Sequence, residues 1–378
     1  MQILITGREQ ALSLAEIESL FGDVTKLNGQ AALINQKQPI NISKLGGTIK
    51  VAEYICELSM ADTKQITDAC HKYIIKDSPG PKFNFGFSYY GEKIPNILKL
   101  GIGIKRELQQ VGLKPRLVES KNGNINAASV KHNKLTTGYE FLLVESNKRL
   151  IIARTTSAQD VDSYSKRDYE KPCRDSKVGM LPPKLSQILI NLAHPEPDHI
   201  VVDPFCGSGG LAMEASLMGY MVDVSDLDSA MLECTNTNIE WFKNEFSPTG
   251  KITVQGPLDA TKRSYPTTSY VVASEGYLGH NFSSNPKTDE IKSQIPKLQE
   301  LYLNLFTNLK NQQKQPERIV ICLPFWMVAA DKIELNIIDD ILKLGYTKSE
   351  FTSVRSSVLE YYRQGQYTGR QILILNSN

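Results

Sequence analysis

The feature that most constrains this chain is an apolar run that ends in an acidic residue and a glycine-rich turn. Residues 201–203 read as a buried strand, glycines stand at 207, 209 and 210, and residues 211–215 begin a helical pattern. This order of strand, turn and helix is typical of a doubly wound α/β sheet, in which ligands bind beyond the carboxyl ends of the strands. We therefore expect a ligand site at this turn, and a purely structural tight turn is the alternative.

The glycine spacing narrows the choice of ligand. It matches neither G-x-G-x-x-G nor G-x-x-x-x-G-K-[ST], and no lysine follows the last glycine, so a cradle for nucleotide phosphates is disfavoured. Glycines permit positive φ and a close approach of the backbone to a ligand. A loop of this kind suits S-adenosylmethionine (SAM), and the predicted cofactor-binding residues within it are Asp203, Phe205, Gly207 and Gly209.

Acidic residues also follow the next two predicted strands. The next strand is read at 220–228, and the carboxylate of Asp226 near its end is predicted to accept hydrogen bonds from ribose hydroxyls, with Asp228 in reserve. Either residue would alternatively cap the following helix, because Asp is favoured at N-caps. Asp259 and Ala260 follow the strand at 252–255 and are predicted to contact the adenine. An Asx-turn is the structural alternative for Asp259.

The fourth strand, at 269–273, is followed by Ser274, Glu275, Gly276 and Tyr277. Here the chain resembles the class I methyltransferases that act on exocyclic amines, whose motif is Asp/Asn/Ser-Pro-Pro-Tyr/Phe. Ser274 and Tyr277 match its ends, whereas Glu275 and Gly276 replace the prolines. The resemblance implies that Ser274 and nearby carbonyls accept from the amine, and that Tyr277 stacks on a flipped or single-stranded base. Positioning in line with the methyl donor supplies most of the remaining catalysis.

Glu275 carries a hypothesis about the base. The Watson–Crick edge of guanine presents two adjacent donors, the ring N–H and the exocyclic amine, whereas adenine presents one. A carboxylate accepts from both donors of guanine, and an enzyme that flips a base is expected to read it by that edge. Glu275 is therefore predicted to select guanine and to hold its amine. A solvated turn, in which Gly276 supplies the bend, is the alternative.

Composition indicates a globular enzyme of more than one domain. The chain has 378 residues, of which 41% are hydrophobic and 22% charged. Its apolar runs fall short of the roughly 18 residues that span a bilayer, and its first residues lack the pattern of a signal peptide. We expect a cytoplasmic protein without membrane contact. The six cysteines form no C-x-x-C pair, so we expect reduced core thiols with neither metal nor disulfide.

Positive charge is concentrated in one part of the chain. Residues 61–180 hold 21 Lys and Arg against 13 Asp and Glu, whereas the remaining residues hold 22 against 28. A basic module joined to an acidic one suits a polyanionic partner, to which phosphate contacts would supply salt-sensitive affinity. A solvated lysine-rich surface is the alternative.

The N-terminal half alternates short strands with helices, including a predicted strand pair near Ala127–Val130 and Gly138–Glu145. It resembles the ferredoxin-like and THUMP domains of RNA-modifying enzymes, on the segments Phe83–Ser88 and Gly101–Leu108. The resemblance implies that this half binds tRNA. The candidate phosphate contacts are Lys105, Arg106, Lys114 and Arg116.

The segment between the halves is polar and proline-bearing. In THUMP-type tRNA guanine-N2 methyltransferases an Arg-x-x-x-x-Arg-Pro segment lines the cofactor and substrate pocket. Residues 167–172 are similar, with Arg167 at the first position and Lys171 where the second arginine would stand. Arg167 is therefore a predicted substrate-binding residue, and a linker without any role in the site is the alternative.

Together these features predict an α/β chain: a Rossmann-like class I methyltransferase domain with a C-terminal antiparallel hairpin, preceded by an α+β ferredoxin-like/THUMP module. The predicted boundaries are 1–55, 56–155, a linker at 156–180, and 181–378. The chain resembles the tRNA guanine(10)-N2-methyltransferase family, which implies SAM-dependent methylation of the guanine N2 amine in tRNA. The alternatives are an rRNA guanine-N2 enzyme, an adenine-N6 DNA enzyme, and an inactive protein that binds SAM and RNA.

Overall fold

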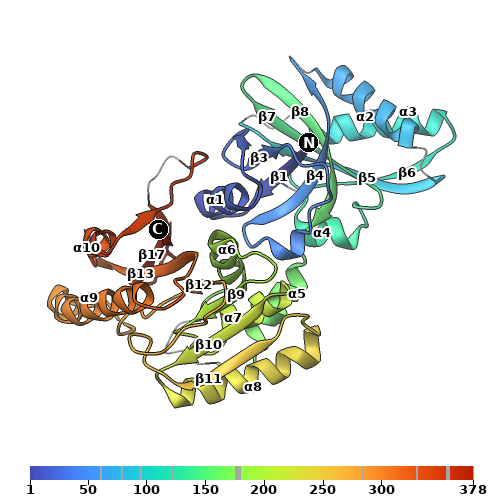
Figure 1. Cartoon of the computed structure of the whole chain (residues 1–378). Helices are drawn as coiled ribbons and strands as arrows, with labels where there is room; N and C mark the ends of the chain where they lie inside the picture. Colours follow the sequence, from blue (N-terminus) through green and yellow to red (C-terminus); the bar gives the residue numbers. More distant parts are fainter. Residues whose placement is uncertain are drawn as a thin grey trace. The chain divides into compact units, whose positions relative to one another are not determined.

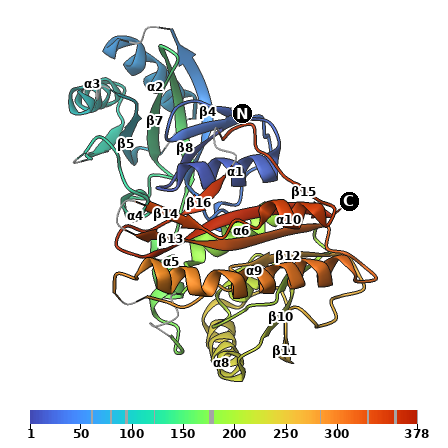
Figure 2. The same cartoon turned by 90° about the vertical axis from the view of Figure 1, so that its left-hand side faces the viewer.

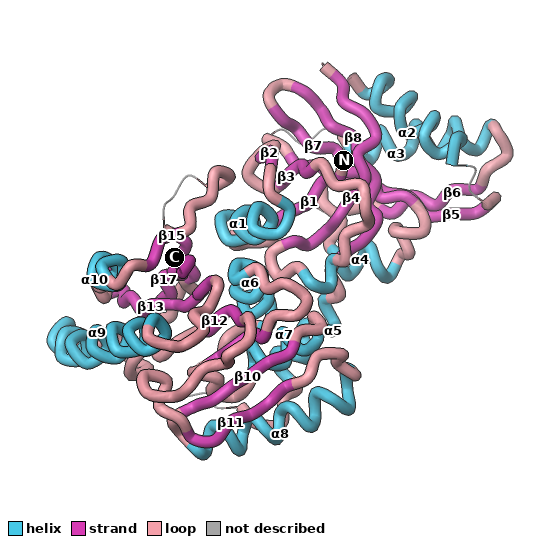
Figure 3. Tube along the Cα trace, viewed as in Figure 1, coloured by secondary structure: helices cyan, strands magenta, loops and turns pink. Residues whose placement is uncertain are grey.

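The computed structural model of the chain describes residues 1–59, 62–77, 80–92, 96–120, 122–174, 180–282, 284–328, 331–354 and 358–377. It divides into two compact units, residues 1–164 and 165–378. Figure 1 shows the elements in chain order, and Figure 3 shows that each unit combines helices with a sheet. In the described part of the chain, no helix combines the length and the apolar character needed to cross a bilayer.

The first unit is built on an eight-stranded sheet with the strand order β2-β3-β1-β4-β8-β7-β5-β6. Its strands are β1 (Gln2–Thr6), β2 (Val24–Lys26), β3 (Ala31–Ile34), β4 (Thr48–Leu58), β5 (Lys82–Tyr90), β6 (Lys114–Val118), β7 (Tyr139–Ser146) and β8 (Arg149–Ala158). Its helices are α1 (Gln10–Phe21), α2 (Thr63–Asp77), α3 (Ile97–Gln110) and α4 (Ala127–His132), together with the 3-10 turn η1 (Ile42–Lys44).

Alternation along β7 gives this sheet two apolar faces. Phe141 and Leu143 pack with buried residues of α2 and α3, whereas Leu142 and Val144 pack with β1 and β8 in a second cluster. Successive strand residues point to opposite faces, so a single strand contributes to both cores. One prediction for this unit is wrong. Residues 127–130 lie in α4, where Asn126 accepts a hydrogen bond from the Ser129 backbone N–H and caps the helix.

Helix α5 (Val161–Tyr169) begins at the end of the first unit and continues into the second. It lies within the segment 156–180 that was predicted to be a linker, of which residues 175–179 fall outside the described part. The second unit has helices α6 (Pro183–Ala193), α7 (Gly210–Leu217), α8 (Ser229–Phe246), α9 (Thr288–Lys310) and α10 (Ile338–Lys343). Its strands are β9 (Ile200–Asp203), β10 (Met221–Asp226), β11 (Ile252–Pro257), β12 (Tyr270–Ser274), β13 (Arg318–Val328), β14 (Asp331–Glu334), β15 (Tyr346–Lys348), β16 (Leu359–Tyr361) and β17 (Thr368–Ser377).

The second sheet has the order β11-β10-β9-β12-β13-β17-β15, with β14 and β16 added at β13 and β17. The contacts from β11 to β13 are parallel, whereas β17 runs antiparallel to β13, β15 and β16. The strand order reverses between β9 and β12, and this switch point is where doubly wound folds bind ligands. The predicted C-terminal hairpin is present as β16 and β17, although Ser357 of that prediction lies outside the described residues.

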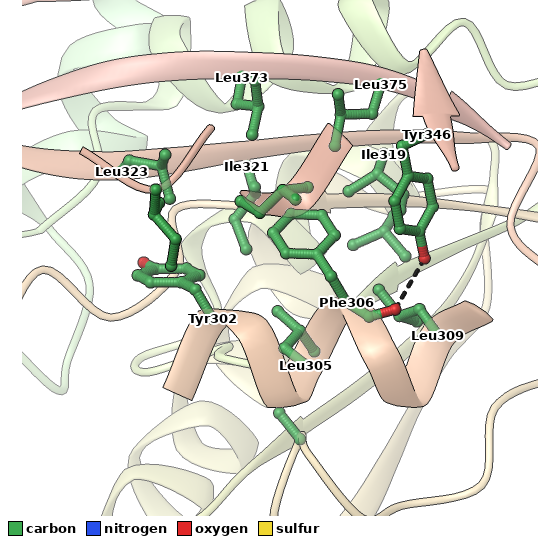
Figure 4. Close-up of a cluster of buried hydrophobic side chains, with 14 of the residues drawn as sticks. Tyr302, Leu305, Phe306, Leu309, Ile319, Ile321, Leu323, Tyr346, Leu373 and Leu375 are labelled. Atoms are coloured by element: carbon green, nitrogen blue, oxygen red, sulfur yellow. Dashed lines mark hydrogen bonds between the residues drawn. The ribbon is translucent and has the colours of Figure 1, made fainter. Parts of the chain in front are cut away.

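The core of this unit lies between α9 and the middle of the sheet. Ile319, Ile321 and Leu323 alternate along β13 toward α9, whose Phe306 packs among them (Figure 4). The Tyr346 hydroxyl donates to the Phe306 carbonyl at 2.9 Å. Helix α6 packs on β12 and β13, and the two turned views place α6 and α9 on opposite sides of the sheet (Figure 1, Figure 2). Both faces of the central strands are therefore covered, which fixes the ends of β9 and β12.

Candidate functional site

The glycine-rich turn lies where the sequence predicts it, between β9 and α7. Gly207 has φ +50° and Gly209 has φ +79°, a conformation that side chains rarely adopt. Gly209 is also the N-cap of α7. A Cβ atom at Gly207 would meet no atom within 4 Å, so this part of the turn faces open space. Gly207, Ser208 and Gly210 line a small pocket together with Asp203 and Glu275; its other lining residues are Met180, Leu181, Phe205, Cys206, Leu211 and Met231.

Hydrogen bonds from β10 and α8 hold this turn in place. Asp226 Oδ2 accepts from the Gly207 backbone N–H at 2.9 Å. On α8, the Thr235 hydroxyl donates to the Gly207 carbonyl at 2.6 Å, and the Asn238 side-chain amide donates to the Ser208 carbonyl at 2.9 Å. The turn is therefore pre-formed by the protein rather than shaped by a ligand.

The acidic residues after β10 and β11 have separate local tasks. Asp228 caps α8 by accepting from the Ala230 N–H, whereas Asp226 remains at the turn. Asp259 accepts from the Thr261 hydroxyl and N–H at 2.7 and 2.9 Å, and the hydroxyl bond lowers the pKa of this carboxyl. Asp259 is thus an Asx-type turn residue. It lies outside the lining of the pocket, as does Ala260.

Asp203 and Ser274, at the ends of β9 and β12, form a buried pair. The Ser274 hydroxyl donates to Asp203 Oδ1 at 2.6 Å and accepts from the Gly276 N–H at 3.0 Å. Burial raises the pKa of Asp203 to about 7, opposed by hydrogen bonds from Ser274 and Phe205. Ser274 has no exposed surface, and its hydroxyl is engaged by Asp203 and Gly276, so the predicted contact of this hydroxyl with a substrate amine has no support in the geometry.

Glu275 is paired with a residue that the sequence analysis missed. Arg370, on β17, donates from Nε and Nη2 to Glu275 Oε1 at 2.6 and 2.5 Å. Arg370 is buried, whereas the Glu275 side chain keeps 19% of its surface and lines the pocket. No local sequence motif links these residues, because they are 95 positions apart. Within the part of the chain that the structure describes, the second oxygen of Glu275 has no hydrogen-bond partner.

The turn after β12 explains why one of the two prolines of the motif is absent. Gly276 has φ +69°, which proline cannot adopt because its ring fixes φ near −65°. A Cβ atom at Gly276 would lie 2.5 Å from the Tyr302 hydroxyl oxygen. That hydroxyl donates to the Tyr277 carbonyl at 2.9 Å. The Tyr277 side chain is left 45% exposed, which suits a stacking surface.

Arg167 and Lys171, in the segment that precedes the methyltransferase-like part, are both buried. Arg167 Nε donates to Glu214 Oε1 at 2.6 Å, and Gln187 donates to the other oxygen of Glu214 at 2.8 Å. Arg167 thus contacts α7, and its predicted contact with substrate stays a prediction. Lys171 is 3% exposed. In the sequence it was singled out by its place before Pro172, where the related segment has its second arginine.

The prediction of six reduced cysteines is wrong for two of them. Cys173 and Cys234 form a disulfide across 61 positions, while Cys56, Cys70, Cys206 and Cys322 are free. Asn238 also joins the same two segments, because its side chain accepts from the Cys173 N–H and donates to the Cys173 carbonyl. The disulfide therefore ties residue 173 to α8, which also holds the glycine turn.

Two of the predicted basic residues meet in a hollow of the first unit. Lys114 and Arg116 on β6 line a cavity of about 540 Å³ with Lys82, Phe83 and Lys134. Lys105 and Arg106 lie on α3 and outside this lining. The sequence analysis missed Lys82 and Lys134, which are brought to β6 by the parallel pairing of β5 and by the turn before β7.

Comparison with known proteins bears on the second unit. Residues 173–247 match the UPF0020 family model, described as an RMKL-like methyltransferase domain. The chain resembles the tRNA guanine(10)-N2-methyltransferase family. The tRNA (guanine(10)-N2)-dimethyltransferase of Methanothermobacter thermautotrophicus is 32% identical over 97 residues, which cover 25% of this chain and 28% of that protein. The enzyme of the same name from Methanocaldococcus jannaschii is 38% identical over 82 residues, 22% of each chain.

The matched region thus spans about a quarter of the length of these relatives. A solved structure, TrmN from Thermus thermophilus, aligns with the whole chain and 99% of its own at a TM-score of 0.50 and 15% identity. At this identity the likeness concerns the fold, and it confirms the predicted class I methyltransferase architecture.

Proposed function

We propose that the chain transfers a methyl group from SAM to the exocyclic N2 amine of a guanine in tRNA. The observation that carries this proposal is the convergence of two elements on one pocket: the pre-formed glycine turn after β9, and Glu275 after β12. The exposed Tyr277 follows Glu275 by two positions. The methyltransferase domain match at 173–247 covers the first element. The names of the relatives supply the base and the RNA.

The pocket fits SAM by its backbone as much as by its side chains. Gly207 and Gly209 hold a left-handed turn with open space beside Gly207, where a ligand can approach the main chain. In this proposal Asp203, Phe205 and Gly207 contact the methionine part, Asp226 the ribose, and Asp259 and Ala260 the adenine. When bound, the cofactor supplies an electrophilic methyl group on a positively charged sulfur.

The residues after β12 then place the guanine. Tyr277 offers an exposed ring for stacking. Glu275 Oε2, left over from the pairing with Arg370, accepts one N–H of the guanine edge, and a turn carbonyl accepts another. Transfer forms the N–C bond, breaks the S–C bond with its electron pair going to sulfur, and leaves one surplus proton on nitrogen. Glu275 and Asp203 line the pocket, and their carboxyl groups are the proposed acceptors of that proton.

The first unit supplies the RNA contact in this proposal. Lys82, Lys114, Arg116 and Lys134 around Phe83 form a concave basic surface on which phosphates and one base would be held. Lys105 and Arg106 on α3 are further basic residues of this unit and separate candidates for phosphate contacts.

The deciding test is methyl transfer from labelled SAM into unmodified tRNA transcripts, followed by nucleoside analysis. We expect N2-methylguanosine, and we expect Glu275→Gln to reduce it. If the label appeared in ribosomal RNA, or in DNA as N6-methyladenine, that nucleic acid would be the substrate in place of tRNA. SAM binding without transfer to any nucleic acid would instead identify an inactive binding protein.

A further inference from the structure

We propose that Lys171 binds the carboxylate of the amino-acid part of SAM and thereby makes the pocket select ligands that retain this carboxylate. The inference rests on the proposed function, because it assumes that the pocket after β9 binds SAM. It adds a residue and a selectivity that the glycine turn alone does not provide.

The position of Lys171 places its charge at the glycine turn. Lys171 follows α5 and is 3% exposed. Its Nζ lies 4.0 Å from the point that a Cβ atom would occupy at Gly210. Gly210 lines the pocket and is the first residue of α7. The ammonium group therefore lies beside the pocket wall, next to a helix N-terminus that also favours an anion.

Lys171 lacks a partner within the part of the chain that the structure describes. No hydrogen bond or ion pair of its ammonium to those residues is present, whereas its neighbours are paired: Glu214 with Arg167, and Glu275 with Arg370. Burial lowers the pKa of Lys171 and outweighs the carboxylates of Asp168, Glu214 and Glu275, which raise it without a direct contact to the ammonium. A buried charge of this kind is costly unless a group of opposite charge meets it.

The charges of the pocket explain which ligand group would meet it. Among the described residues that line the pocket, two are acidic, Asp203 and Glu275, and none is basic. These acids complement the positive sulfur and amine of SAM, but they repel its carboxylate. Lys171 is the cation that the same ligand needs at its other end, on the side of the turn formed by Gly210.

The test compares two ligands that differ by one group, S-adenosylhomocysteine and its decarboxylated analogue, by calorimetry on the full chain. We expect the wild type to bind S-adenosylhomocysteine roughly 10- to 100-fold more tightly, the range for a hydrogen bond between charged groups. Lys171→Met should remove this preference by weakening S-adenosylhomocysteine alone, and Lys171→Arg should keep most of it. Lys243→Met, which removes an exposed lysine of α8, is the matched control.

The outcomes separate the inference from the proposed function. Wild-type protein that binds neither ligand would overturn the SAM proposal itself. Wild-type protein that binds both equally, or a Lys171→Met variant that keeps the preference, would overturn only the role of Lys171. An equal loss of both ligands in Lys171→Met would also overturn it, because a structural lysine affects both alike. The wild-type comparison needs no folded variant.

Discussion

Arg370 directs two guanidinium nitrogens at a single oxygen of Glu275, at 2.6 and 2.5 Å, and Glu275 lines the pocket beside the glycine turn. The pair joins the antiparallel strand β17 to the turn after β12. A buried arginine in this geometry fixes the direction of the carboxylate. Glu275 stands where related motifs have proline, and in this chain Arg370 holds that unusual turn residue in place.

The first prediction concerns this pair. Arg370→Met should lower the turnover number for tRNA methylation by roughly 10- to 100-fold, because Glu275 loses its fixed direction, while affinity for SAM changes little. Arg370→Lys should recover part of the rate. Single-turnover assays with Glu275→Gln and the double variant measure the coupling, and fully additive losses would show that the two residues act independently.

The second prediction concerns the backbone at Gly276. Gly276→Ala places a methyl group 2.5 Å from the Tyr302 hydroxyl oxygen at φ +69°, so we expect a loss of about 1–3 kcal/mol in the free energy of unfolding. Urea unfolding measures it. Gly256→Ala on β11 is the control, since a Cβ atom there meets nothing within 4 Å. Equal stability of the two variants would contradict the strained geometry.

The third prediction is a pH dependence due to Asp203. Its pKa is about 7 in the folded chain, against 3.8 as the ordinary value, because burial disfavours the charged form. The unfolded chain therefore releases this proton first as pH rises, and the folded chain loses stability between about pH 4 and 7. Asp203→Asn, which keeps an acceptor for Ser274, should flatten that part of the profile by a few kcal/mol. Parallel profiles of wild type and variant would refute the raised pKa.

The fourth prediction concerns the disulfide. Joining Cys173 to Cys234 closes a long loop, so reduction should cost about 2–4 kcal/mol of unfolding free energy in the second unit. Unfolding with and without dithiothreitol measures it. The double variant Cys173→Ser/Cys234→Ser should be as stable as the reduced protein and insensitive to reductant. A wild-type protein that ignores reductant would show that the bond makes no contribution.

Local signals predicted those parts of the fold that depend on neighbours in sequence. The strand at 201–203, the glycines and the helix at 211–215 follow from periodicity and turn chemistry, and the structure has β9 and α7 there. The prediction of a strand at residues 127–130 was wrong because so short an apolar pattern fits a strand or a helix equally well. In the structure these residues begin helix α4, which Asn126 caps. The pairing of Glu275 with Arg370 spans 95 positions, and the pairing of Cys173 with Cys234 spans 61. Both pairs are brought together by the fold, so no pattern among neighbouring residues predicts them.

The last prediction concerns the basic hollow of the first unit. Lys114→Ala and Arg116→Ala should each weaken tRNA binding, because each removes a cation from the wall that Lys82 and Lys134 share. Since phosphate contacts release counterions, each loss should also reduce the slope of log affinity against log salt by about 0.9. Titrations of labelled tRNA at several salt concentrations measure both effects. Lys37→Ala, at an exposed loop position of the same unit, is the control and should leave the slope unchanged. If Lys114→Ala and Arg116→Ala kept the wild-type slope and affinity, the hollow would not be the RNA-binding surface. The same titration on Lys105→Ala and Arg106→Ala would then test whether α3 binds the RNA.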